Sequence, residues 1–446
     1  MSGVVQEPAR SIPVIAEADV VVLGGGPAGL AAAACAARHG ASTLLVERYG
    51  FLGGMGTAAG VTNFCGLFAN VHGEIRRVVH GIADELLDRM RALGGLKDPH
   101  DLFGRTRAQA YDMPALKIAA DELLLDSGAR LLFHALAVGV TMHDARRVDA
   151  LIVETKSGRG AVRGKVFIDC SGDGDLAHRA GARWEKGDDN GHILYPTLMF
   201  RVNGVDPRRA DAEAINPLMA AAAAEGSHRF PRKGAIVRPQ KNPSEWRVNV
   251  TQIRNAAGLA MDGTDAMQFS AGEIEGRRQV ADYFRFLRDR VPGFESSYIL
   301  DIATQVGIRE TRRVVGRYML TGQDVLGCAD FEDTIGVNGW PLEQHVAGDV
   351  KWTWPPIPGS RGYNQLPYRM LLPPDIDNLL VAGRCASMSP DAQSAARVSG
   401  ACFVMGQAAG TAAALATGGQ CEPARIDTGA LQSRLEVDGA WLGRAH

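Results

Sequence analysis

The sequence predicts an α/β fold: a parallel sheet covered by helices and built from both ends of the chain, with a smaller α+β unit inserted between them. Three observations predict this. An apolar run from Val20 to Leu23 leads through three glycines into an alanine-rich stretch that Gly40 can stop. A second strand followed by glycine, Leu379 to Gly383, lies near the other end of the chain. Between them, residues 184–305 change to alternating strands and a long amphipathic helix.

The composition is that of a globular protein without a strong charge bias. The 446 residues include 48 Lys plus Arg against 50 Asp plus Glu, a net charge of −2, and 46% are hydrophobic. Such a length suits two or three domain-sized units. The balanced charge predicts no nucleic-acid partner. The chain shows neither a secretory signal pattern at its first residues nor an apolar run of 18 residues, so we expect no export and no membrane span.

The seven cysteines are scattered along the chain, are odd in number and never form a CxxC motif. This pattern predicts a reducing, cytoplasmic location and argues against a zinc or iron–sulfur site, so no metal is expected.

The opening stretch "DVVVLGGGPAGL" places Gly24, Gly26 and Gly29 at the spacing GxGxxG, with Pro27 in the first turn of the helix that follows. In this arrangement the first glycine makes a tight turn, the second lets the backbone approach a pyrophosphate, and the third packs helix on strand. The next strand, "TLLVER", ends in Glu47, where an acid accepts the hydroxyls of an adenosine ribose. Strand, turn, helix, strand and acid together predict a dinucleotide, FAD or NAD rather than NADP.

Further elements follow in order. The loop Gly53–Gly60 consists mostly of small residues and suits a close approach to a ligand. We then expect helices over 74–93 and 113–127, strands over 131–142, 147–155 and 166–168, and a small-residue turn over 171–174.

In the middle of the chain, "TLMFRVNG" and "WRVNVTQI" predict strands of a separate sheet. The long helix after them is expected to begin at a capping box formed by Ser270 and Glu273 and to end before Pro292. We therefore divide the chain into 1–183 and 306–446, which form the nucleotide domain, and 184–305, a cap or substrate domain. In the last part, an Ala- and Gly-rich helix is expected to start near Ser399.

These segments resemble the FAD-dependent oxidoreductase family, in a branch near the flavoprotein subunits of fumarate reductase and succinate dehydrogenase. The resemblance rests on "DVVVLGGGPAGLAAAACAARHGASTLLVERYGFLGG", "ALKIAADELLLDSGARLL", "VFIDCSGDGDLA", "GIRETRRVVGRYMLTGQDVL" and "NLLVAGRCASMSPDAQSAARV" followed by "MGQAAGTAAA". It implies a Rossmann-like FAD-binding domain of the glutathione-reductase type with an inserted α+β cap. The loop "RYGFLGGMGTAAG" lacks the histidine that binds flavin covalently in the succinate dehydrogenase branch, so noncovalent FAD is expected.

The resemblance also assigns binding residues along the length of FAD. The pyrophosphate would be held by Gly24, Gly26, Pro27, Ala28 and Gly29, the adenosine ribose by Glu47 and Arg48, and the adenine by Val138. The flavin side would be contacted by Gly53, Gly54 and Met55, and Ser171 and Gly172 would pass under the dinucleotide. The ribityl chain and phosphate would be reached by Gly383 and Arg384, and the pyrimidine by Val398, Ser399 and Gly400. The amides at a helix N-terminus near Ser399 would stabilise the negative charge of reduced flavin.

Candidate catalytic residues are Arg309, His345, Arg361 and Tyr363. Arg309, Arg313 and Arg317 recur at helical spacing, which also fits a solvated or structural ion-pair face with Glu310; Arg309 could instead clamp a carboxylate. His345 and Tyr363 could each transfer a proton, or serve only in packing. Arg361 shares the loop of Tyr363, at an expected domain junction.

The predicted function is hydride exchange between flavin N5 and a small organic substrate, with an anion as one option, by a dehydrogenase, a reductase or an oxidase. Two alternatives stay open: a flavin-dependent monooxygenase, and an electron-carrier subunit of a larger complex. The sequence fixes neither the substrate nor the oligomeric state.

Overall fold

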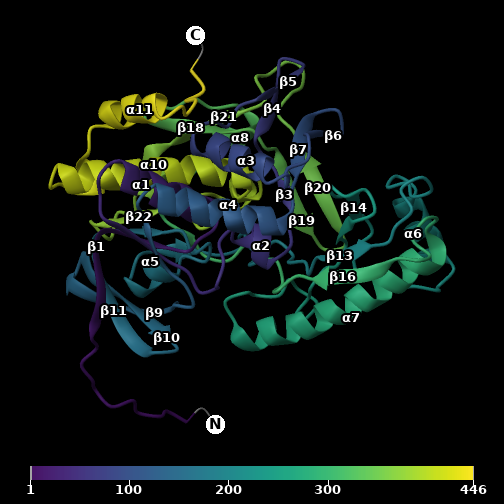
Figure 1. The fold of residues 1–446 in the computed structure, drawn as a ribbon, viewed down its shortest axis with the longest axis horizontal. Helices are drawn as coiled ribbons and strands as arrows, with labels where there is room; N and C mark the ends of the chain where they lie inside the picture. Colours follow the sequence, from purple (N-terminus) through teal and green to yellow (C-terminus); the bar gives the residue numbers. More distant parts are fainter. Residues whose placement is uncertain (1–2, 445–446) are drawn as a thin grey trace.

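A central sheet is built from both ends of the chain (Figure 1). The computed structural model describes residues 3–444. The strand order is β8-β2-β1-β11-β10-β9, and β22 also pairs with β11. Strands β1 (Val14–Leu23), β2 (Thr43–Val46), β8 (Arg130–Leu132), β11 (Gly158–Asp169) and β22 (Leu379–Val381) run parallel, whereas β9 (Leu136–Asp144) and β10 (Arg147–Thr155) are antiparallel additions at one side.

The register of the parallel strands aligns their carboxyl ends. Leu23 lies opposite both Val46 and Asp169, and Asp169 lies opposite Val381. The residues that follow these strands therefore emerge side by side at one edge of the sheet, which is where ligands bind in open α/β sheets. The sequence predicted this parallel arrangement correctly. Its continuous apolar run indicated a strand covered on both faces, and Val20 to Val22 are completely buried.

Helices α1 (Pro27–Arg38) and α10 (Ser399–Gly418) lie side by side against this sheet (Figure 1). Their backbones touch closely, because a Cβ on Gly406 or Gly410 would overlap the carbonyl oxygens of Ala28 and Ala32. Among the described residues, α10 is the one helix long and apolar enough to cross a membrane by length and composition, and 83% of the tested window is buried inside the protein.

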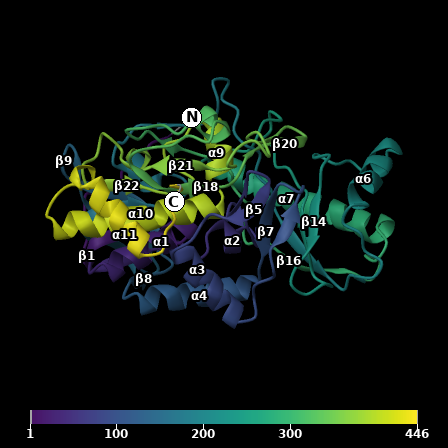
Figure 2. The same ribbon diagram turned by 90° about the horizontal axis from the view of Figure 1, so that it is seen from above.

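The inserted unit has its own sheet and its own core (Figure 2). Its strands follow the antiparallel order β14 (Ile236–Pro239), β15 (Trp246–Asn249), β13 (Phe200–Asn203), β16 (Tyr298–Ile302). Helices α6 (Ile215–Ala224) and α7 (Ala266–Arg290) contribute Met219, Val280 and Phe286 to a hydrophobic core separate from that of the main sheet. The two predicted cap strands are thus present in one sheet.

The predicted start of the long cap helix is wrong. Helix α7 begins at Ala266, where the Asp265 side chain accepts hydrogen bonds from the amides of Met267 and Gln268. Ser270 lies inside the helix and donates to the carbonyl of Ala266, and Glu273 accepts from the amide of Val306 instead of closing a capping box. An aspartate one turn earlier offers an equally good cap, and the chain uses it.

Two other predicted helices differ in the structure. Residues 74–93 divide into β5 (Glu74–Arg77) and α3 (Ile82–Ala92), because Gly81 takes a left-handed φ of 72° and ends the extended segment. Arg309, Arg313 and Arg317 do not share a helix: β17 (Arg313–Val314) is the one regular element there. The expected ion pair of Glu310 forms with Arg313, and both side chains are buried, as in the structural alternative.

The remaining elements surround these two units. They comprise the strands β3 (Asn63–Phe64), β4 (Phe68–Val71), β6 (His100–Leu102), β7 (Thr106–Ala110), β12 (Trp184–Glu185), β18 (Thr334–Asn338), β19 (Leu342–Val346), β20 (Asp349–Thr353) and β21 (Asn364–Pro367), and the helices α2 (Met55–Ala58), α4 (Met113–Asp126), α5 (Asp175–Arg179), α8 (Gly322–Leu326), α9 (Pro390–Ala396) and α11 (Thr428–Val437), with single 3₁₀ turns at Tyr368–Leu371 and Pro423–Arg425. The β19–β20 hairpin reaches the cap, where the Gly348 amide donates to Gln252.

Candidate functional site

The glycine turn after β1 lies at the shared carboxyl edge of the sheet, and its three motif glycines have different surroundings. Gly24 has a φ of +99°, and a Cβ there would lie 2.5 Å from the carbonyl oxygen of Cys170. A Cβ on Gly29 would overlap the carbonyl oxygen of Gly24. The protein itself therefore requires glycine at these two positions.

Gly26 is different, because neither its backbone nor its neighbours require glycine. Its φ of −74° suits any residue, and a Cβ there would meet only the Cα of Gly54, at 3.7 Å. Gly26 is also the N-cap of α1, where helix amides with no intrahelical partner favour an anion. The position that a side chain at residue 26 would occupy is open and lies beside these amides, which fits a phosphate group of a dinucleotide.

Glu47, at the end of β2, lies next to the same turn. Its Oε2 accepts from the Gly25 amide at 2.6 Å and its Oε1 accepts from the Tyr49 amide at 2.9 Å. Each carboxylate oxygen can accept a second hydrogen bond, so the fixed group can still receive ribose hydroxyls. Arg48 extends toward the return from the cap, where its Nη2 donates to Gln305 at 3.1 Å.

We predict that Glu47→Ala weakens FAD binding by about 1–3 kcal/mol, because the ribose hydroxyls lose their buried acceptor. Titration of the apoprotein with FAD, followed by the change in flavin fluorescence, measures this loss. The Glu74→Ala variant removes an exposed carboxylate of the β4–β5 hairpin and is the control. Equal FAD affinity in Glu47→Ala and wild type would contradict the ribose assignment.

Val138 lies on β9. Its side chain packs with Ile12 against a small apolar cluster of Ala150, Ile152 and Ala161 on β10 and β11. The side chain is half-buried, and the expectation that it touches adenine stays a prediction.

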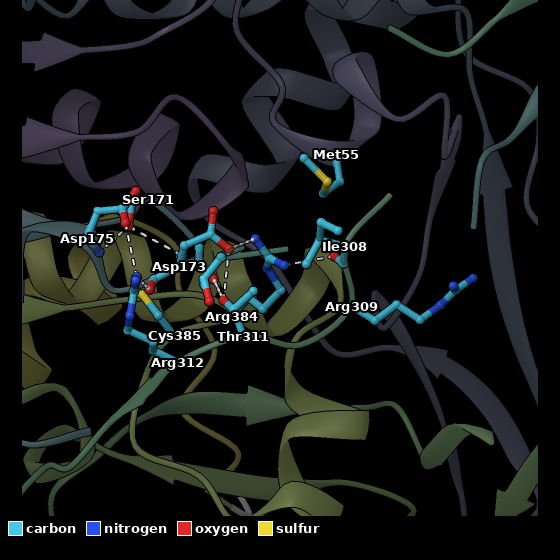
Figure 3. A network of polar contacts seen from close by, with 12 residues as sticks. Met55, Ser171, Asp173, Asp175, Ile308, Arg309, Thr311, Arg312, Arg384 and Cys385 are labelled. Atoms are coloured by element: carbon cyan, nitrogen blue, oxygen red, sulfur yellow. Dashed lines mark hydrogen bonds and ion pairs between the residues drawn. The ribbon is translucent and has the colours of Figure 1, made fainter. Parts of the chain in front are cut away.

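The turn after β11 is joined to the loop after β22 by a polar network (Figure 3). Arg384 donates to Asp173 at 2.9 Å and to the Ile308 carbonyl at 2.9 Å, and Thr311 donates to Asp173 at 2.8 Å. A Cβ on Gly172 would lie 2.7 Å from Arg384, so the guanidinium lies directly against this turn. The structure thus brings together Gly172 and Arg384, both predicted from the sequence, and adds Asp173, which the acidic "GDGD" turn could have indicated.

The buried carboxylate of Asp169 stabilises the same turn after β11. Asp169 accepts from the Ser171 amide at 3.0 Å, from the Ser171 hydroxyl at 2.6 Å and from the Ala177 amide at 2.9 Å. Burial raises the pKa of Asp169, and these hydrogen bonds oppose that rise. Ser171 therefore has a structural partner in addition to its expected place under the dinucleotide.

The N-terminus of α10 lies against the loop at Cys65 and Gly66. The Ser399 hydroxyl interacts with both the amide and the carbonyl of Cys65 at 3.0 Å, and the Gly400 amide donates to the Cys65 carbonyl at 2.9 Å. The expectation that Gly400 offers a free amide is corrected, because this protein acceptor already holds it. Within residues 3–444, the amides of Ser399 and Ala401 have no protein acceptor.

The loop that contains Gly53, Gly54 and Met55 contacts both the glycine turn after β1 and the return from the cap at Gln305. A Cβ on Gly54 would approach the Cα of Gly26 to 2.7 Å, so the loop touches the glycine turn. Met55 begins α2, and its sulfur faces the amide of Gln305 at 3.8 Å. The loop thus connects the turn after β1 to the return from the cap.

Arg309 and His345 come together where the cap meets the main sheet. Arg309 is directed away from the Asp173 network (Figure 3) and donates to the Tyr195 carbonyl and the Thr197 hydroxyl, each at 2.7 Å. The Tyr195 amide donates to the carbonyl of His345 at 3.0 Å. His345 Nε2 lies 3.1 Å from Glu343 Oε1, a partner that the sequence analysis missed although it stands two residues away in "PLEQH".

The charges of this group are fixed by burial and by neighbouring arginines. Burial lowers the pKa of His345 well below its ordinary value, and the nearby Arg309 lowers it further. His345 and Arg397 outweigh burial at Glu343 and lower the pKa of its carboxyl to about 2. At neutral pH the imidazole is therefore neutral and lies beside an ionised carboxylate.

Arg361 and Tyr363 do not join this group. Arg361 donates to the carbonyls of Cys328 and Ala329, and the Tyr363 ring packs against Trp441 with 4.9 Å between ring centroids. Within the described residues neither side chain has a hydrogen bond or ion pair with Arg309 or His345. Their loop packs on the main domain and its C-terminal segment, so the structure does not bring them together with Arg309, and their catalytic roles stay predictions.

Comparison with known proteins gives one match to a protein family. A family model described as FAD dependent oxidoreductase matches residues 19–435. A search of curated proteins found no match.

Among solved structures, the chain is similar to a geranylgeranyl bacteriochlorophyll reductase-like protein from Thermoplasma acidophilum, with 14% identity, a TM-score of 0.47, and coverage of 96% of this chain and 92% of that one. It is also similar to p-nitrophenol 4-monooxygenase from Pseudomonas putida, with 11% identity, a TM-score of 0.48, and coverage of 97% and 91%. These similarities are too low to assign a substrate or a reaction.

Proposed function

Since this chain belongs to the FAD-dependent oxidoreductase family, we propose that it exchanges a hydride between flavin N5 and a small organic substrate held where the cap meets the main sheet. The family binds FAD, and the chain is an enzyme of this class. The observation that supports the proposal is that two features occur in the same molecule: an open position at Gly26, and the Arg309–Glu343–His345 group beside the start of α10.

We infer that FAD lies along the carboxyl edge of the sheet. Glu47 and Arg48 would hold the adenosine ribose, and the turn from Gly24 to Gly29 the pyrophosphate. Gly383 and Arg384 would lie along the ribityl chain, and the free amides of Ser399 and Ala401 would face the pyrimidine. The narrower assignment to a branch near fumarate reductase rests on sequence motifs alone.

When bound, FAD supplies the hydride chemistry, and the protein orients the substrate and handles a proton. Arg309 presents a fixed guanidinium at the junction, and Tyr195 and Thr197 hold its orientation. The neutral imidazole of His345 would hydrogen-bond the substrate, and the adjacent Glu343 carboxylate would fix the orientation of the ring. Arg309 and His345 are buried at this junction, and the Glu343 side chain is 12% exposed.

The direct test is a screen of small organic compounds against the holoenzyme without oxygen, with flavin absorbance as the signal. A substrate that donates hydride must bleach the flavin, and His345→Gln should slow the bleaching while FAD stays bound. Oxygen uptake that depends on NADPH, with a hydroxylated product, would instead support the monooxygenase alternative. Electron transfer only to a partner protein would support the carrier alternative.

We also propose that FAD is bound noncovalently. Two cysteines lie at the start of α10, Cys65 and Cys402, and burial raises the pKa of each thiol to about 12, so the nucleophilic thiolate is scarce. Acid precipitation of the yellow protein should therefore release the flavin into the supernatant. Flavin that remains with the pellet after washing would contradict this prediction.

A cytoplasmic location is part of the same proposal. All seven cysteines are free thiols in the structure, which fits a reducing compartment.

A further inference from the structure

Three of the six tryptophans form a continuous row of ring contacts on the β19–β20 hairpin. The ring centroids of Trp340 and Trp352 are 5.8 Å apart, and those of Trp352 and Trp354 are 6.0 Å apart. Phe103, at the tip of the β6–β7 hairpin, packs its edge on Trp352 with 5.2 Å between centroids. We call Trp340, Trp352 and Trp354 the tryptophan row.

The hairpin places the row so that it leads from the interior to the surface. Trp352 and Trp354 are two residues apart and therefore lie on the same side of an extended segment. Trp340 directly precedes β19, whose Glu343 pairs with Trp352. Trp340 is 3% exposed, Trp352 and Trp354 are half-buried, and the neighbouring Phe103 is 62% exposed.

The inner end of the row lies next to the place inferred for the flavin. A Cβ on Gly66 would lie 3.6 Å from the Cβ of Trp340, and also 3.8 Å from the Cα of Gly400. The same added atom would lie 2.7 Å from Val398, the N-cap of α10. The loop at Gly66 thus touches both Trp340 and the start of α10, where the pyrimidine of the flavin is proposed to lie.

A buried carboxylate stands beside the inner indole. Trp340 Nε1 donates to Glu343 Oε2 at 3.0 Å, and the pKa of Glu343 is lowered to about 2, so this acceptor is ionised. A negative charge in this position makes it easier to remove an electron from the indole, because it attracts the radical cation that forms. Arg397, 3.7 Å from Glu343, offsets part of that attraction.

The outer end of the row is in contact with water. Within residues 3–444, the indole nitrogens of Trp352 and Trp354 have no protein acceptor and are not among the buried unpaired atoms, so both reach solvent. An oxidised indole there can lose its N–H proton to water. The guanidinium of Arg105 lies 5.6 Å over the Trp354 ring, but this cation is exposed, and solvent screens its effect.

We propose that the tryptophan row is a one-electron relay that carries oxidising equivalents from the flavin site to the protein surface. The initial oxidant is FAD excited by light. Each transfer moves one electron inward: Trp340 reduces the excited flavin by one electron, Trp352 restores Trp340, and Trp354 restores Trp352. The Trp354 indole then loses its N–H proton to water, and a soluble thiol or ascorbate returns one hydrogen atom to it. The relay protects the buried site from one-electron oxidation.

One other side chain near the flavin could compete as an electron donor. The hydroxyl of Tyr111 lies against Gly56, in the loop expected on the flavin side. Its aromatic neighbour is Phe64, with 4.3 Å between centroids, and Phe64 in turn contacts Phe403. Phenylalanine is much harder to oxidise than tryptophan, so an electron hole on Tyr111 has no comparable route to the surface.

The test uses the oxidised, FAD-loaded protein without substrate and without oxygen. A short blue pulse excites the flavin, and transient absorption follows the oxidised indole. We expect a long-lived indole signal in wild type that decays faster as ascorbate is added, because the oxidised residue is at the surface. Trp352→Phe and Trp354→Phe should lose this signal, since the electron returns from the flavin to Trp340 before the hole can leave.

The flavin fluorescence lifetime tests the inner step separately. Trp340→Phe removes the first donor, so the lifetime should lengthen. If this buried variant does not fold, the two half-buried positions still test the relay. Trp441→Phe, whose ring packs on Tyr363 outside the row, and Tyr111→Phe are the controls, and both should keep the long-lived indole signal.

The relay rests on the flavin position proposed above and not on hydride exchange. Since no substrate is present, failure of the compound screen leaves this test unaffected. A wild-type protein without a long-lived oxidised indole, or an unchanged signal in both Trp352→Phe and Trp354→Phe, would overturn the relay and leave the row a packing contact only. An unchanged flavin lifetime in folded Trp340→Phe, or loss of the signal in Tyr111→Phe, would also overturn it.

Discussion

Replacement of Gly26 by valine is expected to abolish FAD binding and to leave the fold intact. The backbone at Gly26 has a φ of −74°, which valine accepts, and the nearest protein atom to a new Cβ is 3.7 Å away. The side chain would instead occupy the place inferred for the pyrophosphate and separate it from the amides of α1. We expect the Kd for FAD to rise about 100-fold or more, which corresponds to about 3 kcal/mol.

Two matched variants make this prediction specific. Gly418→Val, at the last residue of α10, adds the same side chain where a Cβ meets nothing within 4 Å, and should bind FAD normally. Gly29→Val should fail to fold, because its Cβ would overlap the Gly24 carbonyl oxygen. Circular dichroism checks folding, and FAD titration of the apoprotein measures the Kd. A folded Gly26→Val protein with full FAD occupancy would refute the phosphate assignment.

Replacement of Glu343 by glutamine is expected to lower the free energy of unfolding by about 3–5 kcal/mol at neutral pH, because it removes a buried carboxylate that lies 3.7 Å from the guanidinium of Arg397. The side chain is 12% exposed and contacts Arg397, His345 and Trp340. Denaturant unfolding of the FAD-saturated protein measures the loss. Glu295→Gln, which breaks an exposed pair with Arg209, should cost less than about 1 kcal/mol.

The same carboxylate gives a defined pH dependence. The folded protein lowers the pKa of Glu343 from 4.5 to about 2, so the charge contributes stability that is fully present above pH 4.5. That contribution is lost as the pH falls from 4.5 through about 2. The difference in unfolding free energy between wild type and Glu343→Gln should therefore be largest near neutral pH and should shrink steadily below pH 4.5. A difference that stays constant down to pH 3 would contradict this assignment.

The parts of the fold that the sequence predicted are those determined by neighbouring residues. The strand Val20–Leu23, its glycine turn, the helix from Pro27 and the acid at Glu47 lie within 28 residues, and each follows from local pattern. Helix α10 begins at Ser399, as predicted, because a continuous Ala- and Gly-rich run follows that residue. The separate cap sheet was visible as alternation in the segments around Val202 and Val248.

The buried arginines near Glu343 could not be predicted in the same way. Arg232, Arg247, Arg309 and Arg397 come from four separate segments, and only the docking of the cap on the main sheet brings them together. The regular spacing of Arg309, Arg313 and Arg317 indicated a helix with a solvated or structural ion-pair face, but close backbone contacts hold this segment in an irregular conformation. A Cβ on Gly307 would lie 3.1 Å from the Thr197 carbonyl oxygen, and one on Gly316 2.7 Å from that of Met370. Such contacts depend on distant parts of the chain.

The close contact between α1 and α10 also sets an order of events during synthesis on the ribosome. Ala28 and Ala32 pack against Gly406 and Gly410, and β11 pairs with β22, so the first and last parts of the chain complete one sheet and its helical cover. Residues 198–308 have their own core and can fold while the ribosome still holds the later residues. A nascent chain that ends before Ser399 lacks both α10 and the amides at its start, so capture of FAD by the complete site comes after translation of nearly the whole chain.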